Sequence, residues 1–297
     1  MGTAGNRDVR AERRRHRALG PAREVARRPR PPAARHGQRR VRAYYAPSLK
    51  GVDATRDEVV AAVELGYTAV KLRTGAGFAT DAELVREVRR VVGDEVEIMV
   101  DANMGYDRNT ALRTAGLLAD LGVRWFEEPI RADSLSQYAR EHSWLAERTA
   151  VPIAGGESLF TLWEYTGLFE PRAFDILQPD CVSVGGISEA KRVADMAGAW
   201  HVECAPHIAC SSGTGIGLAA GLQLLLATPS AQIMEFDAYG GPGWDGLLKR
   251  PVEMVDGWVR APEAPGLGVE LADDAEERFA LDVDAMVARR GGTRTVS

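Results

Sequence analysis

The sequence predicts an α/β fold, a (β/α)₈ barrel of the TIM type, from three observations. Short apolar runs alternate with helical segments over most of the chain. These runs are rich in Val, Ile, Leu and Phe without strict alternation, as expected for parallel strands buried on both faces. Polar residues close the runs at steps of 23 to 30 residues, which is the length of one strand, loop, helix and loop cycle. They are Arg73, Asp101, Glu127, Glu157, Asp180, His207 and Glu235.

The individual elements follow from composition in chain order. Apolar, β-branched runs predict strands at residues 41–46, 67–73, 96–102, 123–129, 151–157, 174–180, 201–207 and 231–237. The segments between them predict helices at residues 53–65, 80–92, 109–121, 133–148, 160–169, 188–200 and 213–227. Asp53 or Thr55 is the expected N-cap of the first helix, and Thr80 opens a Thr-x-x-Glu capping pattern in the second.

One large domain accounts for most of the chain. The 297 residues, 45% of them apolar, suffice for a single barrel, which we assign to residues 41–271, with a helix and a frayed tail at 272–297. Residues 1–43 hold fourteen Arg against three acidic residues, a net charge of +11 in a chain of net charge −5. We expect this Arg- and Pro-rich leader, residues 1–40, to be disordered or non-native sequence. A nucleic-acid arm or a transit peptide ranks below that interpretation.

The remaining composition favours a cytoplasmic protein with no membrane or nucleic-acid partner. No apolar run approaches the roughly 18 residues that cross a bilayer. Cys181, Cys204 and Cys210 are odd in number, form no CxxC pair and follow no secretory signal, so we interpret them as reduced thiols.

Three carboxylates close consecutive predicted strands: Asp101, Glu127 and Glu157. In a closed barrel the carboxyl ends of the strands meet at one face, so these groups would repel one another unless a cation lay among them. Oxygen-only ligation suits Mg²⁺, with Mn²⁺ as a chemically similar substitute. The alternative is that each acid merely caps the helix that follows.

Asp180 and His207 close the sixth and seventh predicted strands, which are neighbours in a barrel. A carboxylate beside an imidazole fixes its tautomer and raises its basicity, which suits a general base. Taken alone, His207 could equally be an ordinary hydrogen-bonded histidine. His201 starts the seventh strand at the opposite end, and we assign it no catalytic role.

Eight short motifs occur in a fixed order: VKLR, VDAN, FEEP, GGES, QPD, VGG, APH and PGLGVEL. Over residues 41–271 this set resembles the enolase superfamily, and within it the mandelate racemase subgroup. The resemblance implies Mg²⁺-assisted removal of the proton α to a carboxylate, giving an enediolate, and a small carboxylate such as a sugar acid as substrate. It leaves open whether the chain forms a homo-oligomer.

The resemblance also implies roles for individual residues. Asp101, Glu127 and Glu157 match the metal ligands, with Glu128 as the second choice beside Glu127. Asp180 and His207 match the catalytic dyad. Glu235 matches an acid that hydrogen-bonds the substrate carboxylate, Asn103 matches a polar residue near it, and Lys71 can neutralise that carboxylate.

The sequence departs from the subgroup in two places. The racemase pattern Lys-x-Lys is here Lys71-Leu72-Arg73, and an arginine stays protonated, so Arg73 is a poor second base. A one-base site favours dehydration of a sugar acid by His207, while Arg73 could hold a distal substrate group. The subgroup's N-terminal capping domain has no counterpart in the leader. The alternatives are therefore a racemase, epimerase or cycloisomerase, or an inactive truncated barrel.

Overall fold

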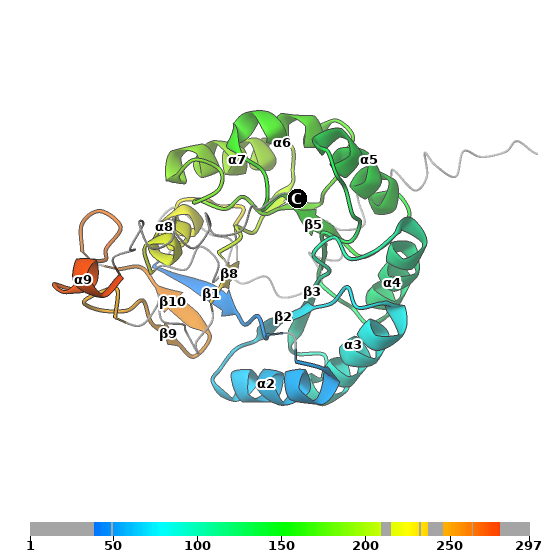
Figure 1. Ribbon diagram of the computed structural model, residues 1–297, viewed down its shortest axis with the longest axis horizontal. Helices are drawn as coiled ribbons and strands as arrows, with labels where there is room; N and C mark the ends of the chain where they lie inside the picture. The colour runs from blue at the N-terminus through cyan, green and yellow to red at the C-terminus, as the bar shows by residue number, and fades with distance from the viewer. Residues whose placement is uncertain are drawn as a thin grey trace, which may run out of the picture.

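Eight parallel strands form a ring at the centre of the molecule, and helices surround it (Figure 1). The computed structural model describes residues 39–48, 50–208, 215–231, 233–236, 246–262 and 264–279. The ring strands are β1 (Arg40–Tyr44), β2 (Ala69–Arg73), β3 (Glu97–Asp101), β4 (Phe126–Glu127), β5 (Ile153–Gly155), β6 (Ile176–Leu177), β7 (Glu203–Cys204) and β8 (Ile233–Glu235).

Strand pairing closes the ring. Strands β2 to β7 pair in chain order in one six-stranded sheet, and β1 pairs with β8 in parallel. Single parallel bridges complete the two remaining seams, Tyr45 with Val70 between β1 and β2, and Cys204 with Ala231 between β7 and the start of β8. The predicted barrel is therefore confirmed.

A helix follows each of the first seven strands. These are α2 (Val52–Glu64), α3 (Phe78–Val92), α4 (Arg108–Asp120), α5 (Leu135–Ala146), α6 (Thr161–Phe169), α7 (Ile187–Ala199) and α8 (Gly215–Leu226). Among the described residues after β8, the chain forms β9 (Met254–Val255), β10 (Trp258–Arg260) and the short helix α9 (Ala275–Phe279). Strand β10 pairs antiparallel with Arg40–Arg42 at the start of β1. Strands β9 and β10 pair antiparallel as a hairpin, which therefore lies at the end of the barrel opposite the carboxyl ends of the ring strands.

The domain boundaries can be compared only in part. Strand β1 begins at Arg40, one residue before the expected start of the barrel. Of the expected leader, residues 1–40, the first 38 lie outside the described residues, as does the expected tail beyond residue 279. The last residue of the leader, Arg40, belongs to β1. Cys181 and Cys204 are buried free thiols, while Cys210 lies outside the described residues. No described helix combines the length and apolar character needed to cross a membrane.

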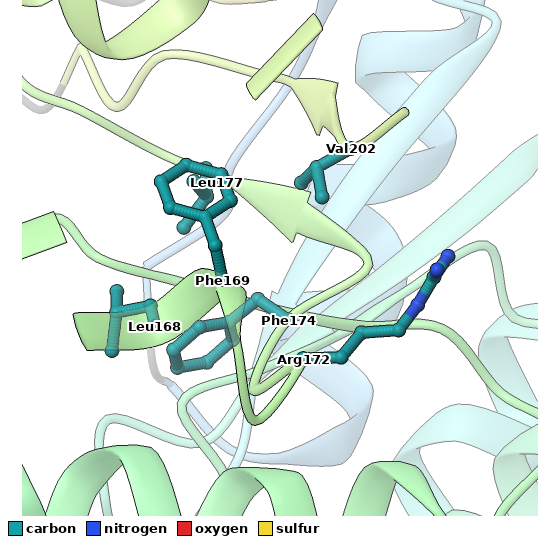
Figure 2. Close-up of a pocket in the computed structure, with 6 residues that line it drawn as sticks. All are labelled: Leu168, Phe169, Arg172, Phe174, Leu177 and Val202. Atoms are coloured by element: carbon teal, nitrogen blue, oxygen red, sulfur yellow. The ribbon is translucent and has the colours of Figure 1, made fainter. Parts of the chain in front are cut away.

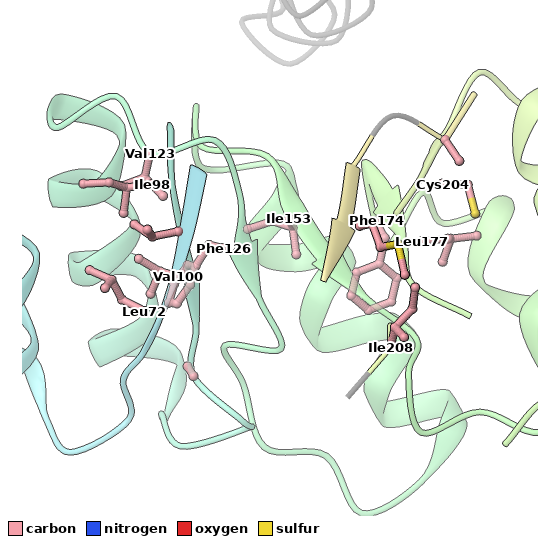
Figure 3. Close-up of a cluster of buried hydrophobic side chains, with 14 of the residues drawn as sticks. Leu72, Ile98, Val100, Val123, Phe126, Ile153, Phe174, Leu177, Cys204 and Ile208 are labelled. Atoms are coloured by element: carbon pink, nitrogen blue, oxygen red, sulfur yellow. The ribbon is translucent and has the colours of Figure 1, made fainter. Parts of the chain in front are cut away.

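Two separate apolar clusters stabilise the barrel. The larger cluster lies between the outer faces of the strands and the helices, and Figure 3 shows part of it around Val100, Phe126 and Leu177. The second cluster takes one side chain from each of the eight strands or the residues beside them, which places it inside the ring. It consists of Tyr44, Ala69, Met99, Trp125, Ala154, Ile176, Ala205 and Ile233.

An ion-pair network closes the amino end of the barrel interior. Arg124, just before β4, bonds Glu97 of β3 at 2.7 Å and Glu203 of β7 at 2.6 Å. Arg42 of β1 bonds the same Glu97 carboxylate at 2.6 Å. These four residues precede the inner apolar cluster on their strands by one or two positions, so they form a charged floor beneath it. We call them the floor network.

The expected cap of the first helix is wrong. Asp53 and Thr55 lie inside α2, whose N-cap is Gly51, with no capping side chain. Gly51 has φ +91°, a conformation that other residues adopt at a cost. The chain thus enters α2 through a glycine-specific turn rather than through a side-chain cap.

The expected capping pattern of the second helix is wrong as well. Thr80 lies inside α3, whose N-cap is Gly77. The carboxylate of Asp81 accepts the backbone N–H groups of Gly75 at 3.2 Å and Gly77 at 2.8 Å. A first-turn carboxylate therefore satisfies backbone donors at the start of this helix.

Candidate active site

The polar residues singled out in the sequence meet at the carboxyl end of the ring. Arg73, Asp101, Glu127 and Glu235 are the last residues of β2, β3, β4 and β8. Glu157, Asp180 and His207 follow the ends of β5, β6 and β7 by two or three residues. Because parallel strands end on one face, residues from all parts of the chain share this mouth.

Lys71 lies at the centre of the carboxylate group. Its Nζ atom is 3.0 Å from Glu127 Oε1, 3.7 Å from Glu235 Oε2 and 3.8 Å from Asp101 Oδ2, and the side chain is only 1% exposed. Burial alone would lower the pKa of Lys71, but Glu127 and Glu235 hold it well above its usual value. The ammonium group therefore remains charged, and it supplies positive charge to the barrel interior.

Glu235 is another carboxylate near Lys71 Nζ, at 3.7 Å. Burial favours its neutral form, but Lys71 and His207 keep its pKa below the usual value. The hydroxyl of Tyr44, one layer into the barrel on β1, donates to Glu235 Oε2 at 3.2 Å. The carboxylate is thus ionised and fixed in position.

Asp101, Asn103 and Arg73 form a second group at the mouth. Both the backbone N–H and the side-chain amide of Asn103 donate to Asp101 Oδ1, at 2.9 and 2.8 Å. The Arg73 guanidinium is 3.8 Å from Asp101 Oδ2 and donates to Asn103 Oδ1 at 3.5 Å. Burial, followed by the charge of Glu127, raises the pKa of Asp101 to about 6. The Arg73 side chain is 37% exposed, so it faces the entrance rather than the interior.

His207 bridges two carboxylates. Its Nδ1 atom is 2.8 Å from Asp180 Oδ2, and its Nε2 atom is 3.2 Å from Glu157 Oε2. Asp180 in turn accepts the backbone N–H of Val182 at 2.6 Å. Burial works against the charged imidazole, but the hydrogen bond with Asp180 and the charges of Glu235 and Glu157 raise the pKa of His207 to about 9. The expected neighbours Asp180 and His207 do therefore form a pair.

Glu128 points to a different environment from Glu127. Its Oε1 atom accepts the hydroxyl of Tyr138, on α5, at 2.6 Å. The same Tyr138 oxygen accepts the backbone N–H of Gly156 at 2.8 Å, and the Tyr165 hydroxyl donates to the Gly156 carbonyl at 2.6 Å. Two helices thus fix the peptide that precedes Glu157. Glu127, bonded to Lys71 inside the ring, is better placed than Glu128 to serve the site.

Three residues of the site were not predicted: Tyr44, Trp125 and Gln178. Each points inward and donates to a site carboxylate. Strand periodicity could have revealed two of them, because Trp125 and Gln178 stand two positions before Glu127 and Asp180 and so share their face. Their partners could not be inferred, because those partners depend on the closed ring.

The donor chemistry of Asp101, Glu127 and Glu157 fits a hard divalent cation. All three supply carboxylate oxygens, and burial and then mutual repulsion raise the pKa of Asp101. Glu157 Oε2 is buried and makes no hydrogen bond of good geometry. In the described part of the chain, no three His, Cys, Asp or Glu side chains have the geometry of a metal site. The carboxylate oxygens of Glu127, Asp101 and Glu157 instead contact Lys71, Asn103 and His207, respectively.

A cavity on the outer side of β6 is a poor candidate for the substrate. It measures about 10 Å³ and is lined by five apolar side chains and one arginine, which Figure 2 labels. Such a space holds one water molecule at most. The lining residues are Leu168, Phe169, Arg172, Phe174, Leu177 and Val202.

Comparison with known proteins agrees with this geometry. A family model described as "Enolase C-terminal domain-like" matches residues 54–275. The chain belongs to the enolase superfamily. The resemblance to its mandelate racemase subgroup is confirmed, and the relatives of this superfamily barrel include sugar-acid dehydratases and cycloisomerases.

Two curated relatives illustrate the range of reactions among the similar proteins. This chain is 35% identical over 254 residues to the D-galactarolactone cycloisomerase of Agrobacterium fabrum. The match covers 81% of this chain and 65% of the relative. This chain is 36% identical over 247 residues to the arabinonate dehydratase of Saccharolobus solfataricus, covering 82% and 64%. The chain thus spans less than two thirds of the length of these relatives.

Solved structures agree as well. An enolase superfamily member from Polaromonas sp. JS666 superposes with a TM-score of 0.74 at 34% identity, covering 83% of this chain and 65% of that one. The 3,6-anhydro-D-galactonate cycloisomerase from Zobellia galactanivorans gives a TM-score of 0.75 at 27% identity, covering 82% and 67%.

Proposed function

We propose that the chain removes the proton α to the carboxylate of a sugar acid and then expels the β-hydroxyl, giving a dehydrated product. The observation that carries this proposal is the placement of His207 between Asp180 and Glu157, beside the buried Lys71 and Glu235. It combines a proton-transfer group with charges that can hold an acid substrate.

In this proposal His207 acts through Nε2. The Nδ1–H group donates to Asp180 Oδ2, so Asp180 fixes the ring and its tautomer. Because Asp180, Glu235 and Glu157 raise the pKa of His207, the imidazolium must first release its Nε2 proton, and the neutral Nε2 atom then takes the α-proton. The same imidazolium then gives a proton to the departing β-hydroxyl, which leaves as water. One group thus serves as base and as acid.

The substrate carboxylate is held by opposite charges. Lys71 neutralises it, and Asn103 hydrogen-bonds it. Glu235 is ionised in the free protein, but a second carboxylate placed next to it favours its protonated form, which can donate a hydrogen bond to the substrate. Asp101, Glu127 and Glu157 would hold Mg²⁺, or Mn²⁺ in its place, and the bound cation supplies positive charge against the negative charge that develops on the substrate carboxylate.

Arg73, at the end of β2, is a poor candidate for a second base. A guanidinium stays protonated at any relevant pH, so exchange on the opposite face of the substrate has no obvious acceptor. Its exposure at the mouth suits contact with a distal hydroxyl or carboxylate instead.

Cycloisomerisation is the second candidate, because the Agrobacterium relative at 35% identity catalyses a reaction of that type. The same proton abstraction would serve it, with a ring oxygen in place of the hydroxyl as leaving group. Product mass separates the two reactions, since dehydration loses one water and cycloisomerisation loses nothing.

The test is proton exchange in D₂O. Wild-type protein with Mg²⁺ is incubated with arabinonate or with D-galactarolactone, and ¹H NMR follows the α-proton while mass spectrometry follows loss of water. We expect exchange for one configuration only, and its loss in His207→Asn. His201→Asn, an exposed histidine at the other end of the barrel, is the control and should behave as wild type. Exchange that persists in His207→Asn would reject His207 as the base, and exchange of both configurations would favour a racemase.

A further inference from the structure

Two neutral N–H donors hold one oxygen of Glu127. The indole Nε1–H of Trp125 donates to Glu127 Oε2 at 3.0 Å, and the Nε2 amide of Gln178 donates to the same oxygen at 2.7 Å. Glu127 and Gln178 are fully buried, as is Trp125. The other oxygen, Oε1, makes a single described contact, with Lys71 Nζ at 3.0 Å.

The two sides of Glu127 differ in character. Indole and amide N–H groups do not titrate in the accessible pH range, so their hydrogen bonds to Oε2 do not depend on pH. Lys71 is instead shared among Glu127, Asp101 and Glu235 and has a flexible stem. Oε1 can therefore exchange one cation for another while Oε2 stays in place.

The orientation of the Gln178 amide strengthens this interpretation. Its Oε1 atom is buried without a hydrogen-bond partner, which is a costly arrangement. The flipped amide would set that oxygen against the Glu127 carboxylate, and two acceptors repel. The contact with Glu127 thus determines the orientation, even at the expense of the amide oxygen.

Gln178 also connects two halves of the site. It follows β6 and stands two positions before Asp180, whereas Glu127 ends β4, and β5 lies between these strands. The hydrogen bond therefore ties the strand that carries the His207 partner to the strand that carries a carboxylate of the proposed metal site.

We propose that Trp125 and Gln178 are positioning residues that fix Glu127 through Oε2 and so present Oε1 as its liganding oxygen. The proposal rests on the proposed function, in which Glu127 helps to hold Mg²⁺. Groups that orient metal ligands typically change metal affinity by about 10- to 100-fold when removed.

The first measurement is Mg²⁺ affinity, read from the rise of Tm with Mg²⁺ concentration in the full chain. Gln178→Met keeps the volume and removes the donor. We expect its dissociation constant for Mg²⁺ to rise by about 10-fold or more. Gln223→Met is the matched control, because Gln223 on α8 donates only to the Leu267 carbonyl at 3.3 Å in the described structure, and it should bind Mg²⁺ as wild type does.

The second measurement does not depend on metal binding. The indole ¹H–¹⁵N resonance of Trp125 is assigned by its disappearance in Trp125→Phe. Without added metal, its hydrogen exchange should be slow in wild type and about 10-fold faster in Gln178→Met, because the carboxylate that accepts it is no longer held. Saturating Mg²⁺ should leave the wild-type indole hydrogen-bonded.

These readouts separate the two ideas. A wild-type Tm that does not respond to Mg²⁺ would refute the proposed function, while indole exchange would still decide whether Gln178 holds Glu127. Unchanged exchange in Gln178→Met would overturn the positioning proposal. So would unchanged Mg²⁺ affinity in that variant, or loss of the indole hydrogen bond when Mg²⁺ binds to wild type, because Oε2 would then be the ligand.

Discussion

Each carboxylate at the mouth of the barrel has a distinct set of neighbours. Glu127 is bonded by Lys71, Trp125 and Gln178, whereas Glu157 meets only the His207 imidazole among the described side chains. Burial, offset in part by His207 and reinforced by Glu127, raises the pKa of Glu157 to about 8. Glu157 is therefore the carboxylate whose charge is least compensated by the protein itself.

This contrast leads to a prediction for Glu157→Gln. The amide has one weak ligand oxygen and no charge, so the Mg²⁺-dependent rise in Tm should be lost, whereas wild type should show a rise at millimolar Mg²⁺. Differential scanning fluorimetry across a Mg²⁺ series measures this. Glu170→Gln, an exposed residue just after α6, is the control and should keep the wild-type response. A full response in Glu157→Gln would mean that Glu157 is not a ligand.

The sequence predicted the residues that end strands better than the residues that support them. Asp101, Asp180 and His207 could be found because a polar residue after an apolar run is visible locally. Tyr138 could not, because its role depends on contacts with Glu128 and Gly156, which lie ten and eighteen positions away and meet it only in the folded barrel.

At the scale of elements, α5 carries an unusual buried histidine. His142 packs between Tyr138 and Phe174, with ring centroids 4.5 and 4.9 Å away, and its Nδ1 atom lies 2.8 Å from the Tyr138 carbonyl oxygen. Its Nε2 atom is buried without a hydrogen-bond partner. Burial lowers the pKa of His142 from 6.5 to about 4, so the folded protein keeps this ring neutral.

The packing of His142 predicts a pH-dependent stability. The unfolded chain binds a proton at His142 below pH 6.5, whereas the folded chain does so only near pH 4. The free energy of unfolding therefore falls by up to about 3 kcal/mol as the pH falls from about 6.5 to 4. Above pH 6.5 His142 is neutral in both states, and the protein has this stability in full. Urea unfolding at several pH values should show this loss in wild type.

His142→Leu isolates the effect. Leucine fills the site without a titrating group, so the variant should lose less stability between pH 6.5 and 4 than wild type does. Parallel curves for the two proteins would show that His142 is not the group responsible.

The order and approximate positions of the elements were predictable because apolar runs mark both strands and helix faces. The strand lengths were not, since β4, β6 and β7 are two residues long where seven were expected. The helix starts were less predictable as well. Neither Gly51 nor Gly77 has a capping side chain, and α2 and α3 begin where a glycine conformation and a first-turn carboxylate allow it. A motif such as Thr-x-x-Glu can occur inside a helix with no capping role, so the pattern misplaced the start.

For the molecule as a whole, the floor network joins strands that lie far apart around the ring. Arg124 contacts both Glu97 of β3 and Glu203 of β7, and its guanidinium also lies 5.3 Å from the Trp125 ring centroid. Nothing in the local sequence around these residues indicates that they meet. Only closure of the barrel brings them together.

Arg124→Met should destabilise the whole barrel. It leaves the carboxylates of Glu97 and Glu203 short of a partner in a largely buried place, at a cost of about 2 kcal/mol in unfolding free energy. Chemical denaturation measures this cost. Arg131→Met is the control, since the ion pair of Arg131 with Asp133 is largely exposed and should contribute little. Equal stability of wild type and Arg124→Met would show that the floor network does not hold the ring together.

The floor network also bears on how small molecules and protons reach the candidate site. Below the site, among the described residues, one layer of apolar side chains and then the ion pairs occupy the interior toward the amino end. In the proposed reaction, we expect reactant, product and solvent protons to use the mouth, where Arg73 is 37% exposed. A molecule lodged there would block all three at once, so bulky acids that never reach the base should still inhibit turnover.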